Sequence, residues 1–430
     1  MIDLSNYFGL NNGKFFGEPP SYVDKRLGPG LSEVPKPTLI GWIQRAPTVL
    51  VTSPNFVWAV IALAVYGLAP YDLGPTSAAI QGPLTTRFFL ERFPLWFSLT
   101  MGYDAFWHVA LYVFQLANRP FLSNRLYSLD KVAHNIFWTT SGITIWTAFE
   151  NVMCYLWATQ KLAYIPDAVS FGSIGGAVAF ILALGLVPLW RSLHFYFAHR
   201  FIHMDDMYKQ VHSLHHRNTD VEPFSGLCMH PVEHLYYFAC ILPSLVFYCS
   251  PFAFLWNGVH LLLSPGASHS GYEDHFQSDA FHYLHHRYFE CNYAGTDAAF
   301  LDLWFGTFQG SFQEGDREAP AAREDAKSSL RLLPTREFMT YLIGSGLCFV
   351  PLALPLESPV AATIAALITG TGPVVLASVV SKVFDTRRGI SPVKMTITGT
   401  TLHLLIGFLF CCVPIMMMAY LSTRPPLSIQ

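Results

Sequence analysis

Long apolar stretches occupy much of this chain and limit what it can fold into. Hydrophobic residues make up 52% of the 430 positions and charged residues only 13%, whereas a soluble domain carries about 25% charged residues. A helix needs about 20 mainly apolar residues to cross a bilayer. Candidate spans lie at 56–69, 95–117, 135–158, 171–190, 338–356, 359–381 and 398–421. The sequence therefore predicts an all-α integral membrane protein, a helical bundle with several spans.

Positive charges between these spans predict an orientation, because Lys and Arg are enriched in cytosolic loops. They gather in the N-terminal arm, in loop 118–134, around 191–217 and in loop 382–396. Alternating spans put all four segments on one side, which we expect to be cytosolic. The net charge of −3 argues against a nucleic-acid partner.

Changes in composition divide the chain into four expected regions. Residues 1–54 form a polar cytosolic arm, and 55–310 form the membrane core. Residues 311–337 are a charged cytosolic linker, and 338–430 are an additional C-terminal transmembrane region.

Histidines are concentrated in one part of the core. Fourteen of the seventeen lie between His194 and His286. Positions i, i+3 and i+4 share one face of a helix, and such spacings occur in a histidine pair and in two H-x-x-H-H motifs. These residues are His199, His203, His212, His215, His216, His282, His285 and His286. Each group can direct its rings to one point, and neutral imidazole is a common ligand of iron, zinc and copper. Since one tetrahedral zinc takes only four ligands, eight rings predict two metals.

Three more histidines, His194, His230 and His269, are candidate ligands; His230 lies where the apolar region 235–263 begins, and His269 lies where it ends. A metal-bound imidazole also needs a hydrogen-bond partner on its second ring nitrogen. The acidic candidates for that role are Glu233, Glu273, Asp274 and Asp297.

The apolar region 235–263 decides whether these histidines can meet. A single crossing there would put the last motif on the opposite face of the membrane from the others. Pro243 and Pro251 interrupt the region, and proline breaks or kinks helices. We therefore expect a re-entrant hairpin, with all the histidines in a cytosolic helical cap that holds a dimetal site. Polar groups lie within other spans at Asp104, His108, Glu150 and Asn151. They could line a substrate cavity, but we expect them to pair between helices.

The motifs resemble those of the fatty acid hydroxylase/sterol desaturase superfamily of membrane di-iron oxidases. The matching residues are His199-Arg200-x2-His203, Tyr208-x3-His212-x2-His215-His216, and His282-x2-His285-His286 followed by Asn292-Tyr293-x-Gly295. The stretches Pro223-Phe224-Ser225 and His230-Pro231-Val232-Glu233 are most similar to sterol C-5 desaturases (lathosterol oxidases). Ala294 stands before Gly295 where members of the family often have glycine, and 338–430 extends beyond the usual core.

The resemblance implies two iron ions, molecular oxygen as co-substrate, and electrons from NAD(P)H through cytochrome b5 or a similar carrier. It also implies a membrane lipid substrate, sterol or fatty acyl, and the endoplasmic reticulum as the location. Introduction of a double bond into a sterol is the favoured reaction.

Two alternatives remain open. The chain could instead hydroxylate a fatty acyl lipid or sterol, or act as a methyl-sterol oxidase, because the ligands alone do not decide the product. It could also be a histidine-rich metal transporter. Transporter sites usually lie near mid-bilayer, whereas these motifs lie in polar stretches outside the expected spans, which favours an enzyme.

Overall fold

Helices account for all the regular secondary structure in the part of the chain that the computed structural model describes. That part comprises residues 54–114, 116–117, 121, 129–165, 174–247, 249–272, 278–295, 298–311, 336–353, 358–384 and 397–427. The expectation of an all-α protein is confirmed for these residues, where β pairing is limited to one isolated bridge between Tyr164 and Cys249. The expected N-terminal arm and charged linker lie almost entirely outside them.

Four long helices open the described chain: α3 (Pro54–Leu68), α4 (Thr86–His108), α5 (Leu129–Ala158) and α6 (Ile174–Ile202). A short 3-10 helix, η2 (Ala78–Gln81), precedes α4, and a π-helical turn, η3 (Val109–Val113), extends it. The Thr85 side chain caps α4 by accepting a hydrogen bond from the Phe88 amide, which supplies one partner that the first turn of a helix lacks.

Short elements follow and carry most of the histidines. They are α7 (Asp205–Gln210), η4 (His212–Arg217), η5 (Pro223–Ser225), α8 (Pro231–Phe238), η6 (Ala239–Ile241), α9 (Leu242–Val246), α10 (Pro251–Ser268), α11 (Ser278–Tyr288) and α12 (Ala299–Trp304). The C-terminal region consists of α14 (Arg336–Leu347), η8 (Val350–Ala353), α15 (Pro359–Phe384) and α16 (Ile397–Ser422).

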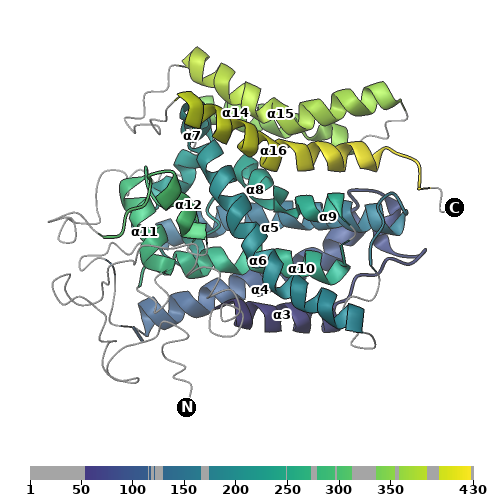
Figure 1. Cartoon of the computed structure of the whole chain (residues 1–430), viewed down its shortest axis with the longest axis horizontal. Helices are drawn as coiled ribbons and strands as arrows, with labels where there is room; N and C mark the ends of the chain where they lie inside the picture. The colour runs from purple at the N-terminus through teal and green to yellow at the C-terminus, as the bar shows by residue number, and fades with distance from the viewer. Residues whose placement is uncertain are drawn as a thin grey trace.

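These elements form a bundle with the C-terminal region along one side (Figure 1). Helices α14, α15 and α16 lie together at the top of the view, and α11 and α12 lie at its left end. Helix α16 packs against α6 and also contacts α8. The C-terminal region is therefore an integral part of the fold.

Aromatic side chains fill the centre of the bundle. Trp146 stacks on Phe254 with ring centroids 5.2 Å apart, and Trp96 meets Trp146 edge to face. All three side chains are fully buried. Large rings that interlock in this way join α4, α5 and α10 into one core.

Three of the seven expected spans coincide with helices that are long and apolar enough to cross a membrane: 176–202, 359–384 and 401–422. Helices α4 and α5, with 23 and 30 residues, are long enough but contain polar residues such as Asp104 and Glu150. The apolar part of α3 is shorter. The expectation of one helical span over 338–356 is wrong, because α14 ends at Leu347 and a 3-10 turn at Pro351 follows it.

The polar groups within the bundle pair between helices, as expected for three of the four. The Arg92 guanidinium donates two hydrogen bonds to the Glu150 carboxylate, at 2.8 and 3.2 Å. Asn151 accepts from the Thr85 amide, and His108 contacts Glu222. The Oδ1 atom of Asp104 has no hydrogen-bond partner among the described residues.

The hairpin expected at 235–263 is confirmed. The Tyr237 hydroxyl donates to the Leu261 carbonyl, and Cys240 contacts Asn257, so the two arms run antiparallel. Pro251 begins α10, and the Ser250 side chain caps it. The start of α8 and the end of α10 consequently lie at the same end of the bundle.

Candidate metal centre

Four segments remote in sequence bring nine histidines together. The end of α6 supplies His199 and His203, η4 supplies His212, His215 and His216, and α11 supplies His282, His285 and His286. His269 is the residue that ends α10. All nine are buried, none more than 6% exposed. Helix α6 thus carries its histidines directly from the membrane bundle into the site.

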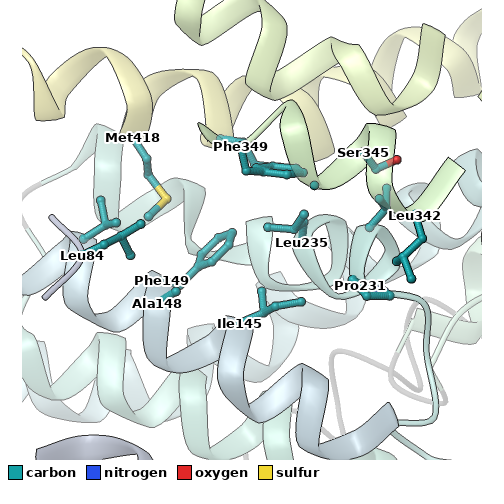
Figure 2. Close-up of a pocket in the computed structure, with 14 residues that line it drawn as sticks. Leu84, Ile145, Ala148, Phe149, Pro231, Leu235, Leu342, Ser345, Phe349 and Met418 are labelled. Carbon is teal, nitrogen blue, oxygen red and sulfur yellow. The ribbon is translucent and has the colours of Figure 1, made fainter. Parts of the chain in front are cut away.

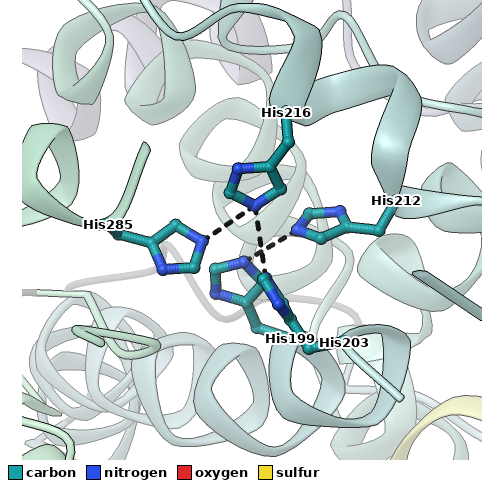
Figure 3. Close-up of side chains that lie close together, drawn as sticks. All are labelled: His199, His203, His212, His216 and His285. Carbon is teal, nitrogen blue, oxygen red and sulfur yellow. Dashed lines mark hydrogen bonds between the residues drawn. The ribbon is translucent and has the colours of Figure 1, made fainter. Parts of the chain in front are cut away.

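The first group of histidines comprises His199, His203, His212, His216 and His285. Their rings point toward one another (Figure 3). The Nε2 atoms of His199 and His212 are 3.1 Å apart, and the Nε2 atom of His216 is 3.2 Å from that of His203 and 3.0 Å from that of His285. One nitrogen of every ring lies within 4.8 Å of one from every other, so a single ion could contact all five.

The second group comprises His215, His269, His282 and His286. The Nε2 atom of His269 lies 3.3 Å from that of His215, 3.0 Å from that of His286 and 3.2 Å from that of His282. Four imidazoles around one point are enough for a complete metal site. The candidate ligand His269 therefore lies at the centre of this group.

Each H-x-x-H-H motif is divided between the two groups, which corrects the expectation that each triplet aims at one point. In η4, His212 and His216 face the first group and His215 the second; in α11, His285 faces the first group and His282 and His286 the second. Residues four apart stay on one face of a helix, whereas the residue between them is turned away. The two groups are consequently neighbours joined through both motifs.

The contacts of the Nδ1 atoms, on the outside of each histidine group, explain why the Nε2 atoms inside the group need a cation. The Nδ1 atoms of His199, His285 and His215 contact the carbonyl oxygens of Tyr293, Cys291 and Cys228 at 2.8, 2.6 and 3.3 Å. A carbonyl only accepts, so each Nδ1 must carry the hydrogen of the neutral ring, and each Nε2 is left with a lone pair. His269 is arranged in the same way against the Pro265 carbonyl. The Nε2 atoms of His215 and His269 are 3.3 Å apart, and their lone pairs repel each other unless a cation lies between them. The set of donor atoms therefore fits a metal.

Glu233 holds the outer nitrogen of His212, with an Oε1–Nδ1 distance of 2.7 Å. The other acidic candidates, Glu273, Asp274 and Asp297, lie outside the described residues. Partners of this kind orient a ligand and raise its basicity, and their loss typically weakens metal binding 10- to 100-fold. Glu233→Ala is expected to weaken metal retention by about that factor, and Glu233→Gln, which keeps an acceptor, by less. Dialysis against a graded chelator measures both; wild-type retention in both variants would contradict the role.

Burial keeps the imidazoles neutral. It lowers the pKa of His215 to about 4, and burial with neighbouring histidines lowers the pKa values of His216, His285 and His286 well below the ordinary 6.5. A neutral imidazole is the form that binds metal. The site is therefore in its metal-binding form at neutral pH.

The same shifts predict how the stability of the metal-free protein depends on pH. The unfolded chain takes up a proton at His215 below about pH 6.5, but the folded chain does so only below about pH 4. Between these values the unfolded state binds more protons, so stability falls as the pH is lowered from 6.5 to 4. Thermal unfolding in detergent at pH 7.5, 5.5 and 4.5 measures this, and His215→Gln should reduce the slope. A midpoint that stays constant over the range would contradict it.

Two predicted ligands do not reach either group. His194 contacts the Phe410 carbonyl of α16 through Nε2. His230 begins α8, where its Nδ1 accepts the Val232 amide and its ring packs on Phe338 and Tyr341. Adjacency in sequence suggested both residues, but the direction of α6 and the capping of α8 turn their rings away.

The Asn292-Tyr293 motif has a supporting role that sequence reasoning did not identify. The backbone of Asn292 is left-handed, with φ of 50°. Its side-chain amide donates hydrogen bonds to the carbonyls of Phe281 and Gln309. The Asp302 carboxylate accepts from the amides of Tyr293 and Ala294. This network fixes the Tyr293 carbonyl that holds His199. An acidic residue shortly after the motif was the available signal.

Comparisons with known proteins identify the same region. Residues 184–307 match the family described as fatty acid hydroxylase. The chain is 27% identical over 253 residues to a Delta(7)-sterol 5(6)-desaturase of Candida dubliniensis, covering 56% of this chain and 63% of the relative. It is 31% identical over 176 residues to methylsterol monooxygenase 1 of Gallus gallus, covering 39% and 54%. A Delta(7)-sterol 5(6)-desaturase of Gibberella zeae is 28% identical over 145 residues, covering 30% and 43%.

These matches span less than two thirds of each of these relatives. No solved structure matches the chain. All nine histidines of the two groups lie within the matched residues. The resemblance that the histidine motifs predicted is confirmed, because residues 184–307 match the fatty acid hydroxylase family and the similar proteins include sterol desaturases and a methylsterol monooxygenase.

Proposed function

We propose that the two histidine groups hold two iron ions and that the protein is an oxygen-dependent oxidase of a membrane sterol. The observation that carries the proposal is the convergence of nine buried Nε2 atoms in two adjacent groups. The first group would hold one ion through His199, His203, His212, His216 and His285. The second would hold the other through His215, His269, His282 and His286. Iron is chosen from the resemblance, since imidazole also suits zinc and copper.

When bound, the two irons would supply the activation of molecular oxygen that oxidation of a C–H bond requires. The chain's own residues bind and orient the metals and keep water out. The carbonyls of Cys228, Cys291 and Tyr293 fix three rings from outside. Burial of every ligand excludes water, which protects a reactive site from side reactions.

A sterol substrate is supported by the similar proteins, which are Delta(7)-sterol 5(6)-desaturases and a methylsterol monooxygenase. Desaturation is our preferred reaction because desaturases recur among them. Hydroxylation or methyl oxidation remains the second candidate, supported by the methylsterol monooxygenase. The electron donor would be cytochrome b5 or a similar carrier, and the histidines would face the cytosol from the endoplasmic reticulum membrane.

Product analysis separates these reactions. Purified protein would be supplied with iron, oxygen, NADPH, cytochrome b5, its reductase, and either a Delta(7)-sterol or a 4-methylsterol. We expect the Delta(7)-sterol to lose two hydrogens, measured by mass spectrometry. Gain of oxygen on the 4-methylsterol would favour the second candidate. Metal uptake by vesicles without any oxidation would contradict the proposal and favour a transporter.

A further inference from the structure

An apolar cavity of about 280 Å³ lies between the histidine-bearing core and the C-terminal region (Figure 2). Its walls come from α5, α8, α14 and α16, through side chains such as Phe149, Leu235 and Met418, and from Phe349 in the turn after α14. Among the described residues that line it, Ser345 is the one polar residue and none is charged. The cavity is close to the roughly 300–1,000 Å³ of small-molecule sites. Leu84 and Gly346 line it and are exposed, so it opens at the surface of the protein.

Helix α8 separates this cavity from the metal ligands. Val232 and Leu235 line the cavity, whereas Glu233 contacts the Nδ1 atom of His212. With 3.6 residues per turn, Glu233 is turned about 160° from Leu235 and about 100° from Val232, so it faces away from the cavity. The cavity therefore lies behind His212, on the side of its Nδ1 atom. A molecule in it would be remote from the Nε2 atoms, where the chemistry would take place.

Unsatisfied polar groups gather beside the cavity. The Nδ1 atom of His230 accepts the Val232 amide, so the neutral ring carries its hydrogen on Nε2. That Nε2 has no partner among the described residues, and the His230 ring lies 5.2 Å from the ring of Tyr341. The hydroxyls of Tyr341 and Ser345, one turn apart on α14, can pair with each other and have no other partner among the described residues. Of these three residues, Ser345 is the one that lines the cavity. All three side chains are at least 98% buried.

Buried donors without acceptors are rare in native structures and need an explanation. A ligand with one oxygen would provide it, because the oxygen could accept from the Ser345 hydroxyl on the cavity wall. A phosphate or carboxylate headgroup does not fit, because the described lining residues include no cation to neutralise it. The apolar walls suit a hydrocarbon body, which the bilayer supplies.

We propose that this cavity binds a membrane lipid whose polar part is one uncharged oxygen, as in a sterol, and holds it without oxidising it. The lipid oxygen pairs with the Ser345 hydroxyl, the polar group on the cavity wall. Its hydrocarbon body packs between α8 and the C-terminal helices. Binding stabilises the start of α8, which carries Glu233 and through it His212. The site does not depend on the proposed oxidase function, because it uses none of the metal ligands.

Two substitutions test the cavity without disturbing the fold. A side chain at Gly346 meets no atom within 4 Å, so Gly346→Leu should fill the cavity and reduce binding roughly tenfold or more. Gly102 on α4 is equally open and lies away from the cavity, so Gly102→Leu is the matched control. Ser345→Ala removes the hydroxyl on the cavity wall and should weaken binding about fivefold, the usual value of one hydrogen bond. Its folding should be unaffected.

The probe is a cholesterol analogue with a photoreactive group in its ring system and a free 3-hydroxyl. The full chain is labelled in phosphatidylcholine nanodiscs, and the labelled peptides are identified by mass spectrometry. We expect labelling of α8 and α14 that Gly346→Leu and Ser345→Ala reduce and Gly102→Leu does not. Unlabelled cholesterol or hexadecanol should compete, and whichever competes better identifies the lipid class; cholestane, which lacks the hydroxyl, should compete poorly.

Three results would overturn the proposal. They are equal labelling of the Gly346→Leu variant and the wild type, competition by cholestane as strong as that by cholesterol, and loss of labelling in His285→Ala. The last would mean that the labelled site is part of the metal centre. If labelling persists in His285→Ala while no sterol is ever oxidised, the lipid site stands and the proposed oxidase function fails.

Discussion

His285→Ala is expected to abolish oxidation by the protein and to remove metal from the first group. The Nε2 atom of His285 lies 3.0 Å from that of His216, and its Nδ1 lies 2.6 Å from the Cys291 carbonyl. Alanine removes a ligand and leaves that carbonyl unpaired. Ligands that act as a unit fail together when one is lost, so turnover should fall to background. Product formation by mass spectrometry measures the loss.

The control for this change is His403→Phe. His403 is a buried ring on α16 that packs on Tyr196, Phe197 and Phe305. It belongs to neither histidine group, and phenylalanine preserves its aromatic contacts. We expect near-normal product formation from this variant. Normal turnover in His285→Ala would exclude the first group from the chemistry.

Glu150→Ala is expected to destabilise the membrane bundle by about 3–5 kcal/mol, the usual cost of breaking a buried ion pair on one side. Glu150 accepts two hydrogen bonds from Arg92 and one from the Trp96 indole, at 2.7 Å. Its removal leaves the buried guanidinium without an opposite charge. Heating in detergent, followed by the loss of monodisperse protein, measures the change.

The matched control lies on α4, the helix that carries Arg92. Arg87 and Glu91 form an ion pair whose side chains are more than half exposed. Exposed pairs contribute about 0–1 kcal/mol, so Glu91→Ala should leave the unfolding midpoint almost unchanged. Equal losses from the two substitutions would mean that burial does not make the Arg92–Glu150 pair important.

The candidate site was largely predictable, because helical spacing is a local property. The six histidines of the two H-x-x-H-H motifs, together with His199 and His203, all belong to the two groups. How they divide was not predictable, because spacing specifies a shared face but not the point that each ring approaches. His269 is a lone histidine, and only the return of the hairpin brings it to His215. His230 is also a lone histidine at one end of the hairpin, but its ring caps α8 and joins neither group.

The fold was predictable where composition alone decides it. Helices α15 and α16 begin and end within a few residues of the expected spans, because long apolar runs leave a membrane chain few other choices. The single span expected at 338–356 is wrong, because α14 ends at Leu347 and a 3-10 turn that contains Pro351 follows. The cavity against α8 could not be predicted, because it depends on how the C-terminal region packs on segments more than a hundred residues earlier.

Metal content is the most direct test of the account. Iron per chain would be measured by mass spectrometry in the purified wild type, in His285→Ala and in His269→Ala, after expression with added iron. We predict two irons in the wild type, with His285→Ala losing the ion of the first group and His269→Ala that of the second. Full iron content in both variants, or a wild type that never holds more than one iron, would contradict a centre built from two groups of imidazoles.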